Sequence, residues 1–203
     1  MKTICVYCGS SDKVDQAYLK AAYETGAVIA SKGMTLVYGA GKTGLMGAVA
    51  DGALHCGGQV VGVMPRQFYT PVLAHNSLSR VEVVDNMHER KARMAKLSDA
   101  FLTLPGGYGT FEEFFEVLTW AQIGLHRKPI GLLNVLGYFD PLMTLIQHAR
   151  KNGFIYEEHT DLFVYAAHPD ALLQAMQDYS PPAGLARWVE REAHIFSNST
   201  KET

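Results

Sequence analysis

Short apolar segments alternate with longer segments of helical periodicity along most of this chain, and this alternation constrains the fold more than any other feature. The apolar segments are nearly continuous in hydrophobic character, which is typical of parallel strands covered by helices on both faces. The pattern therefore predicts an α/β fold with a doubly wound parallel sheet. The expected strands are residues 3–8, 35–39, 59–64, 81–84, 100–105, 129–134 and 162–166. The expected helices are residues 16–31, 45–56, 87–97, 141–151 and 169–177, with a further helix that begins at Thr110.

Length and composition exclude several classes of protein. A chain of 203 residues has room for one domain with a sizeable core. The net charge of -2 argues against broad nucleic-acid binding, and no apolar run is long enough to span a membrane. The N-terminus enters a strand pattern directly, without the layout of a signal peptide. We therefore expect a cytoplasmic protein with residues 1–180 in a single domain, followed by a C-terminal helix and a frayed tail over residues 181–203.

Two of the 3 cysteines form a C-x-x-C pattern at Cys5 and Cys8, a pattern found in some metal and redox sites. Both lie in an expected strand, where residues three apart point to opposite faces of the sheet. The two sulfur atoms could then not bind one metal ion, and only Cys56 remains as a further thiol ligand. We interpret the cysteines as structural and expect no metal site.

A glycine-rich turn, Y-G-A-G-K-T-G-L-M-G, fits the formal pattern G-x-G-x-x-G from Gly39 to Gly44. A dinucleotide site would also need an acidic residue at the end of the next strand, which here reads V-V-G-V-M-P. A Walker A motif would need a glycine at the position of Leu36. The turn is thus rich in amides but has no nucleoside-triphosphate signature. An alternative is that Gly44 and Gly47 only allow a helix to pack closely on the sheet.

The segment L-P-G-G-Y-G-T-F-E-E-F-F-E combines an anion-binding pattern with adjacent acidic side chains. Gly106, Gly107 and Gly109 can leave backbone N–H groups free to face a ligand, and the start of the following helix adds a partial positive charge. Thr110 is a good N-cap, and Thr110-x-x-Glu113 fits a capping box. Two interpretations remain open: Glu113 only caps the helix, or it faces a ligand whose other end is negative.

The segment N-M-H-E-R-K-A-R-M-A-K-L places two cations on an inward face of an expected helix. Met87, Met94 and Leu97 share one face by their spacing, and Arg90 and Lys91 fall on that same face. Burial of a charge is costly without a partner, so this placement favours a binding site. The alternative is that both side chains extend to the surface and pair there with acidic residues.

These segments are expected to open onto one crevice. Ligands of parallel α/β sheets bind outside the carboxyl ends of the strands, near the point where the strand order reverses. The turns after Cys8, Tyr38, Val84 and Leu104 follow such ends. Cations, carboxylates and free amides together suit a polar ligand that carries a phosphate and a sugar.

Four motifs occur in a characteristic order and spacing: V-Y-C-G-S-S, Y-G-A-G-K-T-G-L-M-G, M-H-E-R-K and P-G-G-Y-G-T-F-E-E. Together with T-W-A-Q-I-G and K-P-I-G-L-L-N they resemble the LOG (Lonely Guy) family, once widely labelled lysine decarboxylases, over about residues 3–180. The resemblance implies a Rossmann-like fold, a homodimer, and a phosphoribohydrolase that uses neither a metal nor a cofactor. Members of the family cleave the N-glycosidic bond of AMP and of N6-modified AMP (cytokinin riboside 5'-monophosphates), giving the free base and ribose 5-phosphate.

The resemblance also implies roles for individual residues. The family's catalytic arginine corresponds to Arg90 of M-H-E-R-K, and its catalytic glutamate to Glu113 of F-E-E. One departure is visible in V-L-A-H, which begins with Val72 where family members carry a glutamate, and it affects the expected preference for N6 substituents. The positions that correspond to substrate-binding residues are Lys91, Gly107, Tyr108, Gly109, Thr110, Glu112, Gly9, Ser10, Gly41 and Thr119.

A mechanistic hypothesis follows from these roles. Lys91 and the amides of residues 107–110 would hold the phosphate, while Arg90 would stabilise the departing purine. Glu113 would stabilise positive charge on the sugar, hold ribose hydroxyls or deprotonate the attacking water.

Two other functions compete with this hypothesis. A lysine decarboxylase would need a lysine bound to pyridoxal phosphate, and no lysine of this sequence lies in a context of that kind. A carrier that binds a nucleotide or a cofactor without hydrolysis would need the glycine-rich cradle, but not Arg90 and Glu113 together.

Overall fold

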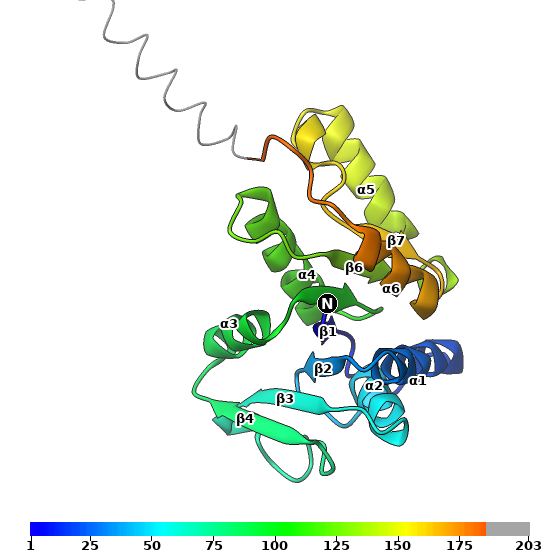
Figure 1. Ribbon diagram of the computed structural model, residues 1–203, viewed down its shortest axis with the longest axis vertical. Coiled ribbons are helices and arrows are strands. Elements are labelled where there is room, and N and C mark those ends of the chain that lie inside the picture. Colours follow the sequence, from blue (N-terminus) through cyan, green and yellow to red (C-terminus); the bar gives the residue numbers. More distant parts are fainter. Residues whose placement is uncertain (186–203) are drawn as a thin grey trace, which may run out of the picture.

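Seven parallel strands form one sheet in the order β4-β3-β2-β1-β5-β6-β7 (Figure 1). The arrangement comes from a computed structural model, which describes residues 1–185. The expected α/β class is confirmed, and so is the doubly wound, Rossmann-like parallel sheet in a single domain. The expected C-terminal helix and tail lie outside the described residues from residue 186 onward.

The observed elements follow the expected alternation, with shifts at several boundaries. The strands are β1 (Thr3–Tyr7), β2 (Thr35–Tyr38), β3 (Val60–Pro65), β4 (Arg80–Val84), β5 (Ala100–Thr103), β6 (Ile130–Leu133) and β7 (Val164–Ala166). The α-helices are α1 (Gln16–Ser31), α2 (Gly44–His55), α3 (Met87–Leu97), α4 (Tyr108–Gln122), α5 (Asp140–Lys151) and α6 (Pro169–Asp178). Short 3-10 helices are η1 (Arg66–Phe68), η2 (Val135–Gly137) and η3 (Glu157–His159).

The strand order reverses at β1, which pairs with β2 on one side and with β5 on the other. Tyr7 at the end of β1 lies opposite Thr103 at the end of β5. From these two neighbouring ends the chain continues in opposite directions along the sheet, toward β2 from β1 and toward β6 from β5. Such a reversal opens a crevice between the two loops, and this crevice is where ligands of doubly wound sheets bind.

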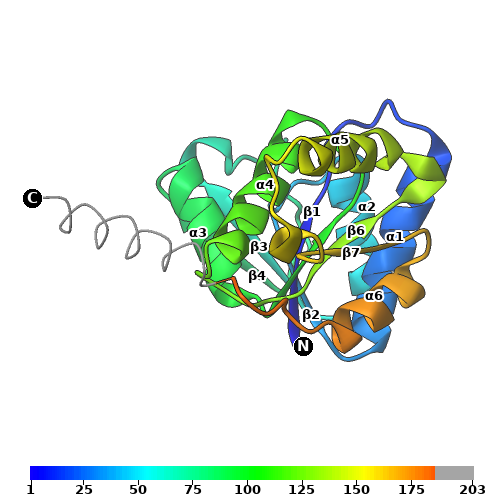
Figure 2. The same ribbon diagram turned by 90° about the horizontal axis from the view of Figure 1, so that it is seen from above.

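Helices cover both faces of the sheet, so each central strand contributes to two hydrophobic cores (Figure 2). Helices α1, α2 and α6 pack on one face, whereas α3 and α4 pack on the other. In β1, Ile4 and Val6 point into the first core, while Cys5 and Tyr7 point into the second. Each large apolar side chain buried in this way contributes roughly 1.5–3 kcal/mol to folding.

The side chains of Cys5 and Cys8 lie on opposite faces of the sheet, as their spacing predicts. Cys5 belongs to one core and Cys8 to the other, because residues three apart on a strand face opposite sides. Both thiols are buried and free. Burial raises the pKa of the Cys5 thiol to about 12, so this group stays protonated and unreactive near neutral pH.

The interpretation that Gly44 and Gly47 bring a helix onto the sheet is wrong. A Cβ atom on Gly44 would lie 2.4 Å from the carbonyl oxygen of Ser11, and one on Gly47 would lie 2.3 Å from that of Lys42. Gly44 also has a φ of 58°, in the left-handed region that favours glycine. These glycines therefore accommodate the loops around the start of α2, including the loop that follows β1.

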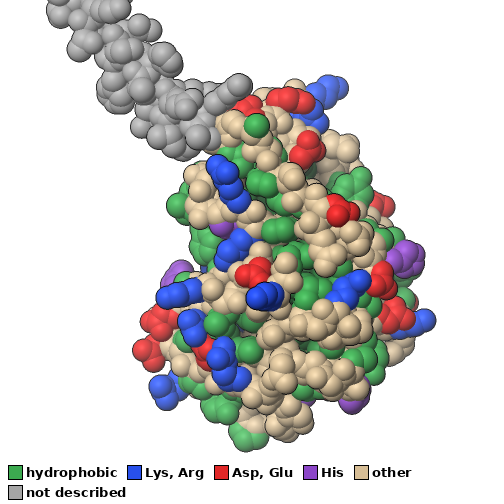
Figure 3. Space-filling view, in the orientation of Figure 1, with side chains coloured by type: hydrophobic (Ala, Val, Ile, Leu, Met, Phe, Trp, Pro, Cys, Tyr) green, Lys and Arg blue, Asp and Glu red, His purple; other side chains and the backbone are tan. Residues whose placement is uncertain are grey.

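Basic and acidic side chains are interspersed on the face of the molecule shown in Figure 3. The whole chain has a net charge of -2. A mixed surface of this kind differs from the continuous basic face that tracks a nucleic acid. Among residues 1–185, no helix combines the length and the apolar character that crossing a bilayer requires.

Candidate active site

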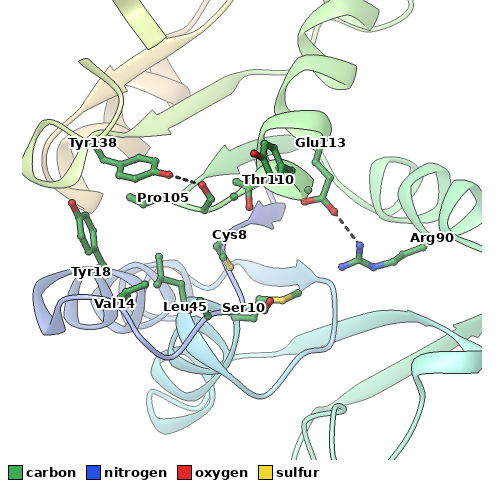
Figure 4. Close-up of a pocket in the computed structure, with 17 residues that line it drawn as sticks. Cys8, Ser10, Val14, Tyr18, Leu45, Arg90, Pro105, Thr110, Glu113 and Tyr138 are labelled. Carbon is green, nitrogen blue, oxygen red and sulfur yellow. Dashed lines mark hydrogen bonds and ion pairs between the residues drawn. The ribbon is translucent and has the colours of Figure 1, made fainter. Parts of the chain in front are cut away.

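A cavity of about 690 Å³ lies beyond the carboxyl ends of β1 and β5, where the strand order reverses. Its walls come mainly from the loop after β1, the start of α2 and the loop between β5 and α4 (Figure 4). Small-molecule sites have volumes of about 300–1,000 Å³, so a nucleotide-sized ligand fits this range. The lining residues are Cys8, Gly9, Ser10, Ser11, Val14, Tyr18, Leu45, Met46, Arg90, Pro105, Gly106, Gly107, Tyr108, Gly109, Thr110, Glu113 and Tyr138.

Close backbone contacts hold the loop before α4 against the loop after β1. The N–H of Leu104 donates a 2.9 Å hydrogen bond to the carbonyl of Tyr7, and the N–H of Gly9 donates one of 3.0 Å to the carbonyl of Pro105. A Cβ atom on Gly106 would lie 2.7 Å from the backbone nitrogen of Gly9. Only glycine therefore fits at this crossing, and the two loops form one continuous wall.

The start of α4 presents backbone N–H groups to the cavity. Its N-cap is Gly107, with the extended dihedral angles φ -96° and ψ -151°. The N–H groups of Tyr108, Gly109 and Thr110 belong to the first helical turn, where no carbonyl of the same helix can accept them. Together with the positive end of the helix dipole they make a site for an anion such as phosphate.

The helix begins before Thr110, so the expected start and the capping box are both wrong. Thr110 lies inside the first turn and is 4% exposed. Its hydroxyl packs beside Gly106 instead of capping the helix. The carboxylate of Glu113 does not reach back to a cap and pairs with Arg90 of α3. Of the two interpretations left open by the sequence, the structure excludes the one in which Glu113 only caps the helix.

Arg90 and Glu113 form a buried ion pair in the cavity wall (Figure 4). Nη1 of Arg90 lies 3.0 Å from Oε1 of Glu113, and the two side chains are 9% and 10% exposed. Nε of Arg90 donates a 3.2 Å hydrogen bond to the carbonyl of Val63 in β3. A Cβ atom on Gly39 would lie 1.6 Å from Nη2 of Arg90, so the glycine after β2 provides the space for the guanidinium.

The environment of Glu113 raises the pKa of its carboxyl group toward neutral pH. Burial raises the pKa of its carboxyl group to about 7, and this effect outweighs the charge of Arg90, which lowers the pKa. A group with this pKa exchanges a proton readily near pH 7, which is the requirement for a general acid or base.

Lys91 lies behind the cavity wall and connects α3 to α4. Its Nζ pairs with the carboxylate of Glu112 and, at 2.9 Å, with Oε1 of Glu116. The Lys91 side chain is 8% exposed. Burial alone would lower the pKa of Lys91, but the two carboxylates raise it above its ordinary value. The successive cations Arg90 and Lys91 are thus both buried and both paired with α4, but only Arg90 lines the cavity.

The predicted substrate-binding residues fall into two groups. Gly41 and Thr119 lie outside the cavity lining: Gly41 forms an isolated bridge with Ala74, and Thr119 is exposed on α4. Lys91 and Glu112 also lie outside it, joined to each other. The predicted residues that do line the cavity are Gly9, Ser10, Gly107, Tyr108, Gly109 and Thr110.

The segment that departs from the family pattern lies beside the glycine-rich turn. Val72 is 72% exposed, and the N–H of Lys42 donates a 3.1 Å hydrogen bond to the neighbouring carbonyl of Leu73. His75 contacts Asp51 of α2, with Nε2 and Oδ1 3.1 Å apart. The effect of Val72 on the preference for N6 substituents stays a prediction, because these residues lie outside the cavity lining.

Sequence reasoning missed the apolar part of the cavity, which is formed by Val14, Tyr18, Leu45, Met46 and Tyr138. Leu45 and Met46 directly follow Gly44 in the segment Y-G-A-G-K-T-G-L-M-G, and this position is a usable signal. Tyr18 lies in a helix whose periodicity does not tell which turn approaches a ligand. Tyr138 follows the strand that neighbours β5 in the sheet, so its position becomes informative only when the strand order is known.

Comparisons with known proteins identify the family. Residues 46–176 match a family model described as possible lysine decarboxylase. The cytokinin riboside 5'-monophosphate phosphoribohydrolase LOG of Oryza sativa subsp. japonica is 43% identical over 199 residues, which cover 97% of this chain and 81% of the relative. LOG7 of Arabidopsis thaliana, which carries the same activity in its name, is 44% identical over 180 residues, covering 89% of this chain and 83% of the relative.

Solved structures share the fold at lower identity. The molybdenum cofactor binding protein of Rippkaea orientalis has a TM-score of 0.68 and 21% identity, over 88% of this chain and 97% of that one. The molybdenum cofactor carrier protein of Chlamydomonas reinhardtii has a TM-score of 0.67 and 21% identity, over 87% of this chain and 96% of that one. At this level of identity the likeness shows the fold alone. The family match and the relatives at 43% and 44% identity confirm the resemblance found in the motifs: this chain belongs to the LOG family of cytokinin riboside 5'-monophosphate phosphoribohydrolases.

Proposed function

We propose that this protein hydrolyses the N-glycosidic bond of AMP and of N6-modified AMP, the cytokinin riboside 5'-monophosphates. The reaction consumes one water molecule and releases the free base and ribose 5-phosphate. The observation that carries the proposal is the buried Arg90–Glu113 pair, which lines the same cavity as the free N–H groups at the start of α4. The names of the curated relatives, which state this activity on cytokinin riboside 5'-monophosphates, support it.

In the proposed complex the phosphate binds at the start of α4. The N–H groups of residues 107–110 donate to it, and the helix dipole favours its negative charge. Glu113 lies three residues beyond Thr110, about 4.5 Å further along the helix axis. Its carboxylate therefore faces the ribose and not the phosphate, which reconciles an acidic side chain with an anion site on the same helix.

Charge development during cleavage explains the two side chains of the pair. The transition state is positive on the ribose and negative on the departing base. The ionised carboxylate of Glu113 stabilises the sugar cation or takes a proton from the attacking water, and Arg90 stabilises the base as it leaves. The pKa of about 7 for Glu113 suits a group that accepts a proton near neutral pH.

The description of the family as lysine decarboxylase finds no support in the cavity. Such an enzyme holds pyridoxal phosphate as a Schiff base on a lysine. Within the part of the chain that the structure describes, the cavity lining contains no lysine. Lys91, on the helix that carries Arg90, is bound by two carboxylates and is not available as a nucleophile.

We also propose a homodimer, as the family resemblance implies. Apolar side chains gather at the surface in the segment after β3, where Phe68, Tyr69, Val72 and Leu73 are 40%, 51%, 72% and 45% exposed. Exposed apolar surface of this kind often marks a contact between proteins. Sedimentation velocity tests the proposal, and a monomer at micromolar concentration would contradict it.

Incubation of the purified protein with AMP and N6-isopentenyl-AMP tests the proposed activity, with chromatography to separate base and ribose 5-phosphate from nucleotide. We expect both substrates to be cleaved, while IMP, CMP and dAMP measure the selectivity for base and sugar. A Glu113→Gln preparation, which keeps the shape of the buried pair, controls for contaminating hydrolases. Binding of AMP without release of adenine at high enzyme concentration would contradict the hydrolase proposal and favour a carrier that binds the nucleotide without hydrolysis.

A further inference from the structure

We infer that Tyr138 is a positioning residue for the phosphate of the substrate. Its hydroxyl fixes the peptide group between Gly106 and Gly107, so that the N–H of Gly107 faces the ligand. The inference rests on the proposed function, because it takes the loop before α4 to be the phosphate site. Tyr138 lies outside the motifs that connect this chain with its family.

The contact itself is a hydrogen bond of 2.6 Å, which the Tyr138 hydroxyl donates to the carbonyl oxygen of Gly106. A peptide group is planar and trans, so the C=O of Gly106 and the N–H of Gly107 point in opposite directions. A carbonyl directed at Tyr138 therefore directs the following N–H to the other side of the loop. In Figure 4 the loop lies between Tyr138 on one side and the pair of Glu113 and Arg90 on the other.

This peptide group needs such a contact because glycines flank it on both sides. Without Cβ atoms, Gly106 and Gly107 have access to backbone conformations that other residues avoid. After a half-turn of the peptide, the Gly106 carbonyl oxygen would face the phosphate and repel it. Packing confines this peptide only at Gly106, where a Cβ atom would lie 2.7 Å from the nitrogen of Gly9; a Cβ atom on Gly107 would meet no atom within 4 Å. The Tyr138 hydrogen bond selects the orientation that binds an anion.

The turn after β6 holds Tyr138 in position. The side chain of Asn134 accepts a 2.7 Å hydrogen bond from the N–H of Phe139 and donates one of 2.7 Å to Asp140. Leu136, inside this turn, has a φ of 51°, a conformation that costs energy for a residue with a side chain. The Asn134 network stabilises this strained turn and thereby fixes the direction from which Tyr138 reaches the loop.

Ring contacts hold the aromatic part of Tyr138 independently of its hydroxyl. The ring meets Tyr18 of α1 edge-on with centroids 5.9 Å apart, and Phe139 with centroids 5.0 Å apart. Edge-to-face pairs at these distances are favourable. The substitution Tyr138→Phe keeps the ring and both contacts, so it removes the hydrogen bond while the turn remains folded.

Tyr138→Phe is therefore the variant that tests the inference. We expect the Kd for inorganic phosphate, measured by calorimetry, and the KM for AMP to rise about 3- to 10-fold, the effect of one hydrogen bond. The kcat should stay within about twofold, because Arg90 and Glu113 are untouched. The matched control is Tyr165→Phe, which removes a hydroxyl from a residue of β7 that is 59% exposed and lies outside the cavity lining. Its phosphate affinity and KM should equal those of the wild type.

Phosphate binding separates this inference from the proposed function, because it does not depend on hydrolysis. A wild-type protein that binds phosphate but leaves AMP intact would contradict the function, while Tyr138→Phe could still be judged by its phosphate affinity. Wild-type affinity for phosphate in Tyr138→Phe would overturn the inference, as would a lower kcat at unchanged KM. A lower Tm with unchanged affinity would show a merely structural role and overturn it as well. Failure of the wild type to bind phosphate would remove its basis.

Discussion

Nη1 of Arg90 lies 3.0 Å from Oε1 of Glu113, and the two side chains are only 9% and 10% exposed. The pair joins α3 to α4 in the wall of the cavity, so each side chain keeps the other in place. Removal of either partner by truncation would leave an unpaired buried charge, which is strongly destabilising. A test of the chemistry must therefore change the charge of Glu113 and keep its shape.

Glu113→Gln meets this requirement. The amide oxygen of glutamine still accepts the hydrogen bond from Arg90, so the fold should stay intact. A glutamine can neither balance positive charge on the ribose nor accept a proton, so kcat for AMP should fall about 100- to 1,000-fold. Steady-state kinetics and thermal denaturation measure the two effects on one preparation.

The matched control for this variant is Glu116→Gln, on the same helix and one turn further. Glu116 pairs with Lys91 and lies outside the cavity lining, so the kcat of the Glu116→Gln enzyme should stay near that of the wild type. Near-normal turnover in Glu113→Gln would show that Glu113 is not the catalytic carboxylate.

The pH dependence of turnover follows from the pKa of about 7 for Glu113. Below this pH the carboxyl group is protonated and can neither stabilise the sugar cation nor act as a base. We expect kcat/KM for AMP to rise with pH, by about tenfold per unit well below the pKa, and to level off above pH 7. The phosphate of AMP titrates separately, near about pH 6. A profile without a step near pH 7 would contradict the assignment.

Stability should depend on pH in the opposite sense. The pKa of Glu113 lies at about 7 in the folded protein against an ordinary value of 4.5, so the folded state holds the proton more tightly than the unfolded state. Its contribution, roughly 3 kcal/mol, is fully present below pH 4.5 and is lost as pH rises through 7.

Urea denaturation at pH 5 and pH 8 measures this contribution by comparison with Glu113→Gln. The difference in free energy of unfolding, variant minus wild type, should increase from pH 5 to pH 8, because glutamine is never ionised. A decrease of this difference with pH would mean that the charge of Arg90 outweighs burial and lowers the pKa of Glu113.

The sheet and the place of the site are predictable from sequence because both follow from local patterns. Short continuous apolar runs that alternate with helical segments, such as residues 100–105, favour parallel strands, and parallel strands bring their carboxyl ends to one edge. Arg90 and Glu113 lie in the first two turns of helices that follow strands, so this rule places both near that edge. Their pairing, in contrast, depends on how α3 and α4 pack against each other.

Other features depend on contacts between distant segments and escape sequence reasoning. Thr110 is a preferred capping residue, but Gly107 adopts the extended backbone of an N-cap, and the helix begins earlier. Arg90 and Lys91 fall on one broad face, yet successive helical side chains differ by about 100° in direction. Arg90 therefore reaches the cavity, while Lys91 reaches Glu112 behind it. No periodicity in the sequence distinguishes these two outcomes.

Gly39 leaves space for the guanidinium of Arg90, so a side chain at this position should impair catalysis. A Cβ atom at this position would lie 1.6 Å from Nη2 of Arg90, so Gly39→Ala should displace the guanidinium from Glu113. We expect kcat for AMP to fall at least about tenfold, since small misplacements of catalytic groups are costly.

The control for Gly39→Ala is Gly62→Ala in β3. A Cβ atom on Gly62 would crowd Leu78 Cδ1 at 2.5 Å and Ala40 Cβ at 2.6 Å, and its three nearest atoms all belong to these two residues. This variant should lower the Tm through overpacking and leave kcat near that of the wild type. Equal losses of activity in both variants would show that crowding of the sheet, and not the position of Arg90, causes the effect.

Lys91 provides the last prediction, because its position behind the cavity wall differs from the phosphate-binding role that the family resemblance implies. Lys91→Met should lower the free energy of unfolding by about 1–3 kcal/mol, because it removes the buried cation that pairs with Glu112 and Glu116. The loss is moderate because both carboxylates keep access to water. The KM for AMP should change less than about threefold, as for a residue that does not touch the substrate. Lys96→Met removes an exposed cation from the same helix and should alter neither quantity. A large rise in KM without a loss of stability would place the Lys91 ammonium group on the phosphate.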